Sequence, residues 1–399
     1  MKYNFDEIID RRHEKYSYSM KWGQGPFVAD MVGVQEVKED SIPLFTADMD
    51  FRCAQPILDA LEGVVKHGIF GYSRQEFAKG YYDAIIHWFE KRRNWKIKEE
   101  EIVYVNGTVE AIKQIIIAFT NPGDGVIIQR PVYGPFSGVI NQTKRNIVNN
   151  ALVEKANGYY EMNFEDLERK AADENNKILL LCNPHNPVGR IWNKEELQKV
   201  SDICARNNVL IVVDEIHGDL IRKSEEFHPM ATLVHNSKLI TCTAVNKTFN
   251  LAGLHATNLI ISDKNIREHL KESMGFIGPS PFTLAATIAA YTEGEEWLEQ
   301  LLDYLDDNID FVINYLKEYM PKAKCRRPEG TYILWIDLRE YNLSAKEIHR
   351  RIYEEAGVLL EGGELFDPEH GKGFERICVP SPRPLLEEAL KRISDVFEK

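Results

Sequence analysis

From about residue 100, short apolar runs alternate with longer stretches of helical periodicity, and this alternation restricts the folds open to the chain. Each run is long enough for one strand and is bounded by polar or turn-forming residues. Strands that are apolar on both faces must be covered on both faces, so the pattern predicts a mostly parallel sheet between two layers of helices. The runs lie at 101–107, 123–136, 177–184, 208–216, 238–245 and 256–263.

A second, smaller domain is predicted after about residue 285, where this rhythm changes. Apolar residues recur at helical spacing through 295–320, which predicts one long amphipathic helix. A strand at 330–338, a helix at 347–358, a short strand at 375–382 and a closing helix follow. We therefore expect a large domain over 47–286 and a small α+β domain formed by 287–399 and an N-terminal arm, 1–46.

Charge and cysteine usage disfavour several classes of partner. The chain has 49 Lys and Arg against 62 Asp and Glu, a net charge of −13, which argues against nucleic acid and anionic membranes. No apolar run approaches the roughly 18 residues of a membrane span, and the charged start lacks the apolar core of a secretion signal. The six dispersed cysteines form no Cys-x-x-Cys pair, so we expect a reducing cytoplasm.

Polar residues follow several predicted strands, at the position where ligands bind in open α/β sheets. Gly107 and Thr108 lie between a strand and a helix, where their backbone N–H groups could hold a phosphate or simply begin the helix. Asp214 follows five apolar residues and could either pair with a protonated pyridine nitrogen or cap the next helix. Lys247 lies in a turn between two apolar runs, either solvated or bonded to a carbonyl cofactor.

Three further side chains could complete such a site. Tyr133, between Pro131 and Pro135, could stack on a flat heterocycle or pack in the core. The amide of Asn186, in a proline-rich loop, could bond a phenolic oxygen or form an Asn turn. Arg376 begins a late apolar strand, where it could clamp a carboxylate or form a salt bridge between domains.

Together these groups fit one chemistry. A phosphate cradle, an aspartate for a ring nitrogen, a stacking aromatic, an arginine for a carboxylate and a lysine predict a pyridoxal 5′-phosphate enzyme that acts on a small amino acid. His185, His217 and His255 do not have the spacing of metal ligands, so we expect no metal site.

Segments along nearly the whole chain carry a family resemblance: KW at 21–22, PLFTADMDF at 43–51, GYSR at 71–74, PVYGPF at 131–136, NPHNPVGRIW at 183–192, DEIHGDLI at 214–221, NKTFNLAG at 246–253 and GTYILWIDL at 330–338. On these segments the chain resembles the class I/II aminotransferase superfamily, the fold type I pyridoxal-phosphate enzymes. Within it, the chain is most similar to the C–S β-lyase branch, the cystathionine β-lyases and cystalysin. The resemblance implies an α/β fold whose large domain has a mostly parallel seven-stranded sheet flanked by helices, beside a smaller α+β domain.

The resemblance implies a role for each candidate residue. Lys247 would be the Schiff-base lysine, and Asp214 the partner of the pyridine nitrogen. Asn186 would bond the 3′ oxygen of the cofactor, and Tyr133 would stack on its ring. Lys247, Asp214 and Tyr133 are thus the expected catalytic residues, and Arg376 would bind the substrate carboxylate.

The phosphate and the remaining contacts are assigned in the same way. Gly107 and Thr108 would hold the phosphate, and the further cofactor contacts would be Val109, His217, Thr243 and Asn246. Tyr72 would reach the phosphate of the neighbouring subunit's cofactor, which implies a homodimer with shared active sites. Tyr72 and Asn186 would also contact the substrate.

The chain departs from the family pattern near the lysine. Many members have a phosphate-binding arginine eight residues after the lysine, where this chain has His255. The C–S lyase branch also tends to lack that arginine, so His255 favours a lyase. Asn246 and Ala244 stand where relatives often have serine. Phosphate binding would then depend more on Thr243, Asn246 and the Gly107 turn.

Three functions remain open from the sequence. The first is a C–S β-lyase that converts cystathionine or cysteine-like amino acids to pyruvate, ammonia and a thiol. The second is an aminotransferase of broad or aromatic specificity, and the third is a regulatory binding protein with the same fold. Lyase and aminotransferase both begin with removal of the Cα proton by Lys247, so the fold alone does not choose between them. His255 and the DEIH and KW segments favour the lyase.

Overall fold

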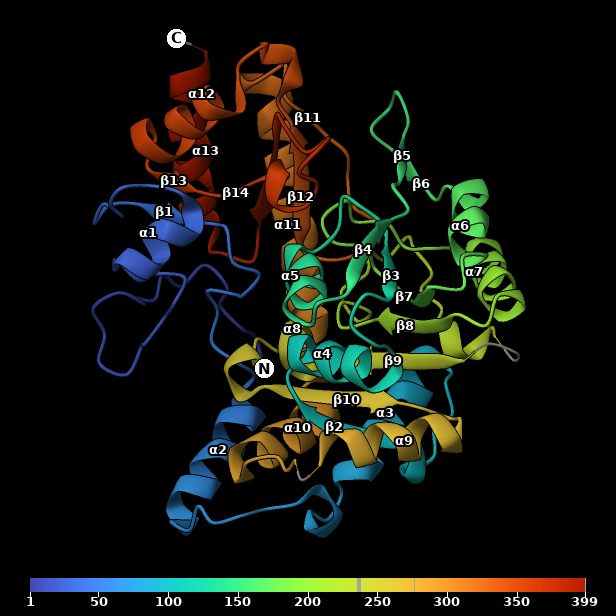
Figure 1. The fold of residues 1–399 in the computed structure, drawn as a ribbon. Helices are drawn as coiled ribbons and strands as arrows, with labels where there is room; N and C mark the ends of the chain where they lie inside the picture. The colour runs from blue at the N-terminus through green and yellow to red at the C-terminus, as the bar shows by residue number, and fades with distance from the viewer. Residues whose placement is uncertain (235–237, 276, 399) are drawn as a thin grey trace.

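The computed structural model describes residues 1–234, 238–275 and 277–398 (Figure 1). Its large sheet has seven described strands in the order β2-β10-β9-β8-β7-β3-β4. β10 runs antiparallel to both neighbours, and the other pairs are parallel, which confirms the predicted mostly parallel sheet. The strands are β2 (Ile102–Asn106), β3 (Gly125–Ile128), β4 (Asn146–Asn149), β7 (Asn176–Cys182), β8 (Leu210–Asp214), β9 (Leu239–Thr243) and β10 (Ala256–Ile260).

Helices cover both faces of this sheet because successive strand residues point to opposite sides. Val126 and Ile128 belong to the core on one side, whereas Ile127 belongs to the core on the other. The first core is closed by α4 (Thr108–Phe119), α5 (Gly134–Gln142) and α9 (Lys264–Met274). The second core is closed by α6 (Phe164–Ala171) and α7 (Lys194–Arg206) (Figure 1).

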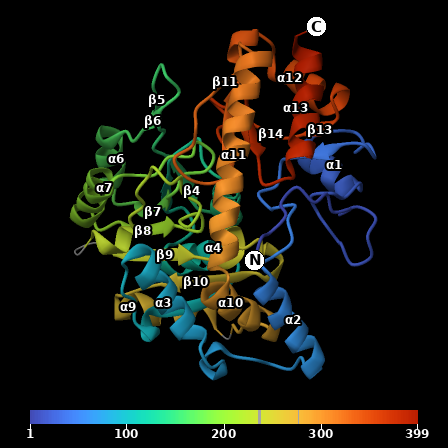
Figure 2. The same cartoon turned by 180° about the vertical axis from the view of Figure 1, so that it is seen from behind.

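A third group of helices packs at the β2 edge and leads to the small domain. α10 (Pro281–Glu293) packs against α2 (Gln55–His67) and α3 (Tyr81–Arg93). The long α11 (Glu295–Tyr319) then runs from this group to the small domain, as Figure 2 shows. It confirms the helix predicted over 295–320.

The small domain is built on a four-stranded described sheet of order β11-β12-β15-β14. Its strands are β11 (Lys324–Cys325), β12 (Ile333–Asp337), β14 (Glu361–Gly362) and β15 (Phe374–Cys378), and α13 (Arg383–Phe397) closes it. The helix predicted over 347–358 is divided into α12 (Ala345–His349) and a π-helical segment (Arg350–Glu355). β13 (Val358–Leu359) pairs in parallel with β1 (Ile42–Pro43) of the N-terminal arm, so the arm packs on the small domain.

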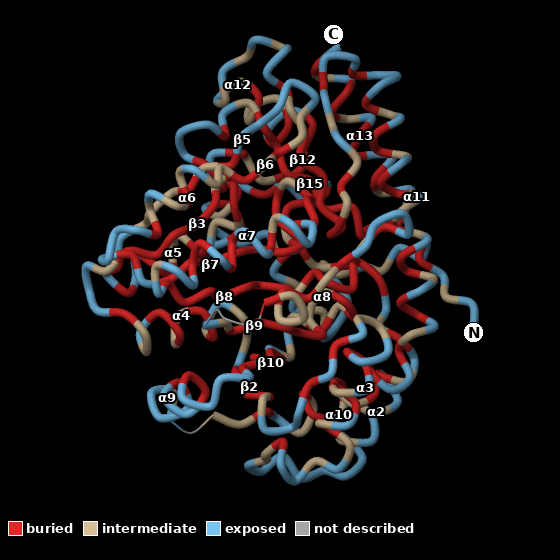
Figure 3. The backbone as a smooth tube through the Cα atoms, turned by 90° about the vertical axis from the view of Figure 1, so that its right-hand side faces the viewer, coloured by how far each residue is buried: buried red, intermediate tan, exposed pale blue. Residues whose placement is uncertain are grey.

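One continuous apolar core joins the arm, α10, α11 and the small domain. The division into 47–286 against 1–46 and 287–399 therefore stays a prediction, since packing does not separate these units. Figure 3 shows the buried chain segments concentrated in the sheets and on the inner sides of the helices. Among the described helices, none is both long and apolar enough to cross a membrane.

The N-terminal arm, which contains α1 (Pro26–Val32), is fastened by one buried carboxylate. Asp50 accepts hydrogen bonds from Lys21 Nζ at 2.7 Å and from Trp22 Nε1 at 2.8 Å. Arg11 Nη1 at 2.6 Å and Ser381 Oγ at 2.6 Å complete the set. Burial opposes ionisation of Asp50, but Lys21 and Arg11 outweigh it and hold the pKa of Asp50 below its ordinary value. The KW segment at 21–22 thus attaches the arm to the core.

Candidate active site

A cavity of about 440 Å³ lies between the carboxyl end of the large sheet and the small domain. Its lining includes six of the predicted site residues, namely Tyr133, Asn186, Asp214, His217, Lys247 and Arg376. β7, β8 and β9 are adjacent and parallel, so the segments that follow them meet at one edge of the sheet. The small domain supplies Arg376 from β15.

Lys247 lies in the short helix α8 (Val245–Thr248), directly after β9. Its Nζ donates a hydrogen bond to the backbone carbonyl of Ala47 at 2.5 Å. The hydroxyl of Tyr332 donates to the same carbonyl at 2.9 Å. Burial lowers the pKa of the Lys247 ammonium. The lysine predicted to lie in a turn is therefore in a helical turn, and its side chain reaches into the cavity.

Asp214 is the last residue of β8 and is only 3% exposed. Burial raises the pKa of its carboxyl group to about 7, against a smaller effect from the Ile216 backbone N–H. That N–H donates to Asp214 Oδ1 at 3.2 Å. In the described part of the chain, no basic side chain forms an ion pair with Asp214. The charge of Lys247 also lowers the pKa of Asp214, but without an ion pair its effect is outweighed by burial.

Two further side chains of the lining, Tyr133 and His217, have pKa values that burial shifts. Tyr133 precedes the first turn of α5, and burial raises the pKa of its phenol. His217 is 3% exposed, and burial lowers the pKa of its imidazole well below the ordinary value. His217 is therefore neutral near pH 7 and contributes no charge to the cavity.

Arg376 is buried, and its guanidinium already has several partners. Nη2 donates to the carbonyl of Phe45 at 2.6 Å and forms an ion pair with Glu361. Nη1 donates to Asn186 Oδ1 at 3.3 Å. Nε is buried and has no hydrogen-bond partner in the described residues. The guanidinium thus keeps an unused donor at Nε.

Several predicted residues lie outside the lining of this cavity. Gly107 has φ 91° and precedes α4, which begins without a side-chain cap. The Thr108 hydroxyl lies 3.0 Å from the Thr257 hydroxyl, and the Thr243 hydroxyl donates to the Asn258 carbonyl at 2.8 Å. The others outside the lining are Val109, which follows in α4, Asn246, which precedes the lysine, and Tyr72, which is fully exposed. Their roles stay predictions.

The structure adds residues that the sequence did not single out. Glu361, Met20 and Met31 line the cavity, and Ala47 supplies the carbonyl beside Lys247. Of these, only Glu361 carried a usable signal. It is a carboxylate directly after three apolar residues, Val358 to Leu360, in the segment GVLLEGG.

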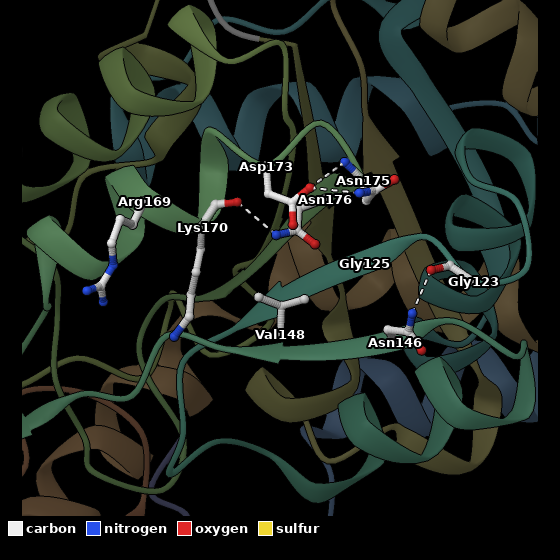
Figure 4. A pocket seen from close by; sticks show the side chains of 9 residues that line it. All are labelled: Gly123, Gly125, Asn146, Val148, Arg169, Lys170, Asp173, Asn175 and Asn176. Atoms are coloured by element: carbon white, nitrogen blue, oxygen red, sulfur yellow. Dashed lines mark hydrogen bonds between the residues drawn. The ribbon is translucent and has the colours of Figure 1, made fainter.

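A second cavity, of about 590 Å³, lies at the amino ends of β3, β4 and β7, the opposite end of the strands from Lys247. Figure 4 shows the residues that line it. Its polar side chains bond to neighbouring protein groups. Asn176 donates to the Lys170 carbonyl at 2.8 Å, and Asn146 donates to the Gly123 carbonyl at 2.6 Å. Lys170 Nζ donates to Asp166 at 2.6 Å. We assign no chemistry to this cavity.

The chain matches a known protein family, related sequences and solved structures. Residues 42–393 match the family model described as aminotransferase class I and II. The chain is 37% identical over 391 residues to the cystathionine beta-lyase PatB of Bacillus subtilis, an alignment that covers 96% of this chain and 98% of that protein. A PLP-bound putative aminotransferase from Clostridium difficile 630 has a TM-score of 0.93 and 40% identity, over 99% of this chain and 100% of that chain. Cystalysin from Treponema denticola, which contains pyridoxal 5′-phosphate, has a TM-score of 0.92 and 34% identity, over 100% and 99%.

Proposed function

The chain belongs to the aminotransferase class I and II family, and on that basis we propose that it is a pyridoxal-phosphate-dependent C–S β-lyase acting on cystathionine or similar cysteine conjugates. The reaction converts R–S–CH₂–CH(NH₃⁺)–COO⁻ and water into a thiol, pyruvate and ammonium. The observation that carries the chemistry is the meeting of Lys247, Asp214 and Arg376 in one cavity. The choice of a lyase rests on the similarity to a cystathionine β-lyase and to cystalysin.

The residues present fit the cofactor. A protonated pyridine nitrogen would give the buried Asp214 carboxylate the ion pair that no basic side chain among the described residues forms with it. Lys247 would bind the cofactor covalently, and Tyr133 would stack on its ring. The Asn186 oxygen accepts a hydrogen bond from Arg376, which leaves its amide nitrogen as the donor to the phenolic oxygen.

The phosphate would lie at the start of α4, where backbone N–H groups and the helix dipole favour an anion. Gly107, Thr108 and Val109 form this first turn. Asn246 Oδ1 and His217 Nδ1 are also buried, and neither has a hydrogen-bond partner in the described residues. These two groups are free to bond a ligand or a water molecule. Thr243 is a less favourable contact, because its hydroxyl already bonds Asn258.

Bound in this way, the cofactor supplies an electron sink for negative charge that develops at the substrate Cα. Arg376 holds the substrate carboxylate and so orients the Cα–H bond. The ε-amine of Lys247 takes the Cα proton, because its lowered pKa increases the neutral fraction near pH 7. The Cβ–S bond breaks with its electron pair on sulfur, which leaves as the thiol after protonation. Water then replaces the amine, and pyruvate and ammonium result.

We also propose a cytoplasmic homodimer in which each subunit contributes to the other's site. Tyr72 supports this, because it is 102% exposed on a segment without contact to its own cavity. Ile69, Phe70 and Phe77 are exposed nearby on the same segment, and exposed apolar groups of this kind mark association surfaces. The six cysteines are all free thiols, which supports a reducing compartment.

The assignment is tested by incubating the purified holoenzyme with L-cystathionine without any 2-oxo acid. Pyruvate, ammonium and thiol are expected in equal amounts. Turnover that requires a 2-oxo acid acceptor would instead identify an aminotransferase and reject the lyase. Lys247→Ala should abolish pyruvate formation, whereas Lys238→Ala, at an exposed lysine before β9, should not.

A further inference from the structure

Glu361 is the second carboxylate of the Lys247 cavity, and it takes no part in the chemistry above. It lies on β14, directly opposite Arg376 of β15 in the antiparallel register. Directly paired residues place their side chains on the same face, and here the two form an ion pair. The Glu361 side chain is 23% exposed, whereas that of Arg376 is 3% exposed. The acid is therefore the more accessible member of the pair, and both residues line the cavity.

Binding of an amino acid changes the surroundings of this glutamate. Arg376 is the expected anchor of the substrate carboxylate, so a second anion then shares the guanidinium with Glu361. Nη2 of Arg376 already donates a hydrogen bond to the Phe45 carbonyl, and Nη1 donates one to Asn186 Oδ1. Two carboxylates that share one guanidinium repel each other, and some N–H groups of this guanidinium already donate hydrogen bonds to the protein. Glu361 then requires another positive partner.

The cavity wall does not provide that partner. Among the described lining residues, the cationic side chains are Lys247 and Arg376, and both have assigned tasks. The lining also includes the apolar side chains of Met20, Met31 and Leu365, which suit methylene or thioether groups. Within one subunit, the remaining source of a positive charge for Glu361 is therefore the substrate.

We propose that Glu361 is a specificity-determining residue that binds a cationic group on the leaving thiol, such as the distal ammonium of cystathionine, and disfavours anionic leaving groups. This inference rests on the proposed lyase function, since it concerns the group that departs with sulfur.

The test compares three β-eliminating substrates of equal chain length. S-(2-aminoethyl)-L-cysteine has a cationic leaving group, S-propyl-L-cysteine a neutral one and S-carboxymethyl-L-cysteine an anionic one. Wild type should show kcat/KM for pyruvate formation falling in that order. Glu361→Gln should lower the value for the aminoethyl substrate about tenfold relative to the propyl substrate, and raise it about tenfold for the carboxymethyl substrate.

A matched control removes the same charge from the same segment. Glu364 is exposed, lies three residues further on and does not line the cavity. Glu364→Gln should keep the wild-type order of the three substrates. If Glu361→Gln changes all three values by the same factor, the glutamate acts only on Arg376 and the inference is overturned.

A binding measurement separates this inference from the lyase assignment. L-lysine, L-norleucine and L-2-aminoadipate have side chains of similar length and no sulfur to eliminate. Calorimetric Kd values for the holoenzyme should rise in that order, and the differences should collapse in Glu361→Gln. A wild type that releases no pyruvate from L-cystathionine or from any of the three S-substituted cysteines would reject the lyase, while the Kd series would still decide the role of Glu361. Equal Kd values in wild type would overturn the inference.

Discussion

Asp214 combines burial with the absence of a basic partner among the described residues, and its substitution has two opposite consequences. Asp214→Asn keeps the volume but no longer holds the cofactor's ring nitrogen protonated. The value of kcat/KM should fall about 100-fold or more, with a smaller loss of cofactor affinity because the amide still forms a hydrogen bond. Steady-state kinetics and equilibrium dialysis of pyridoxal phosphate measure the two effects. Wild-type kcat/KM in the variant would contradict the assigned role.

The same substitution should stabilise the cofactor-free protein. The folded-state pKa of Asp214 is raised to about 7, above its ordinary value of 3.8. A group with a raised folded pKa adds stability below its unfolded pKa, and that stability is lost as the pH rises through the folded pKa. Cofactor-free Asp214→Asn should therefore unfold at a higher temperature than wild type at pH 8, and differ less at pH 5. Identical unfolding midpoints at both pH values would contradict this argument.

Glu375 makes the stability of the small domain sensitive to pH. Burial raises its pKa to about 8, and the Tyr353 hydroxyl donates to it at 2.9 Å. The raised pKa means that stability declines as the pH rises toward and through 8. Glu375→Gln should remove this decline, a difference on the order of 2 kcal/mol between pH 6 and 9 in denaturant unfolding. Glu354→Gln, at an exposed site, should retain the wild-type pH dependence.

Sequence analysis found the site residues that lie just after parallel strands. It missed the site residues whose position depends on the pairing of segments far apart in the chain. Asp214, Asn186 and Lys247 were predictable because neighbouring parallel strands carry their carboxyl ends to one edge. Glu361 was not, since its contact with Arg376 depends on the register of a two-residue strand. The position of the Ala47 carbonyl depends in turn on how the arm packs.

At the scale of elements, long periodic segments were predicted from the sequence, whereas short or irregular segments were not. α11 and the apolar strands β7 and β8 match their predictions, because their patterns are long and regular. β4 was not predicted, since its four residues NIVN hold only two apolar side chains. The arm was not resolved into elements either, because tertiary ion pairs rather than periodicity hold it in place.

The arm also helps to position the Ala47 carbonyl, which accepts the hydrogen bond from Lys247. This leads to a prediction for Lys21. Its side chain is fully buried against Asp50, three residues after the carbonyl that receives Lys247. Lys21→Met should leave a buried carboxylate with one cation fewer and lower the free energy of unfolding by about 3 kcal/mol. It should also raise KM, because the segment containing Ala47 loses its anchor. Denaturant unfolding and steady-state kinetics measure these changes.

A second substitution distinguishes loss of this ion pair from general damage. Lys21→Met combined with Asp50→Asn removes both charges, so the double variant should lose clearly less stability than the sum of the single variants. Lys15→Met, at an exposed lysine of the arm, is the control and should have little effect. Additive losses would show that Lys21 and Asp50 do not stabilise the arm as a pair.

At the scale of the whole molecule, the active site is a contact between two layers. The large sheet supplies Asp214 and the residues around Lys247, and the small domain supplies Arg376 and Glu361. Figure 1 shows β8 and α8 of the first group and β14 of the second. Relative movement of these layers changes the distance between the groups that hold the cofactor and those that hold the substrate. One continuous apolar core across the arm, α11 and the small domain opposes such movement.

The shared site proposed for the homodimer can be tested by combining two inactive subunits. Lys247→Ala removes the base, and Tyr72→Phe removes the hydroxyl proposed to reach the partner's phosphate. If Tyr72 acts across the interface, a hybrid dimer holds one site with both defects and one site with neither. Co-expressed subunits should then regain about one quarter of wild-type activity, because random pairing makes about half of the dimers hybrid and each has one intact site of two.

If Tyr72 acts within its own subunit, each hybrid site retains one defect and no activity returns above the Tyr72→Phe level. Tyr319→Phe, at an exposed tyrosine that ends α11, controls for loss of a surface hydroxyl and should be fully active alone.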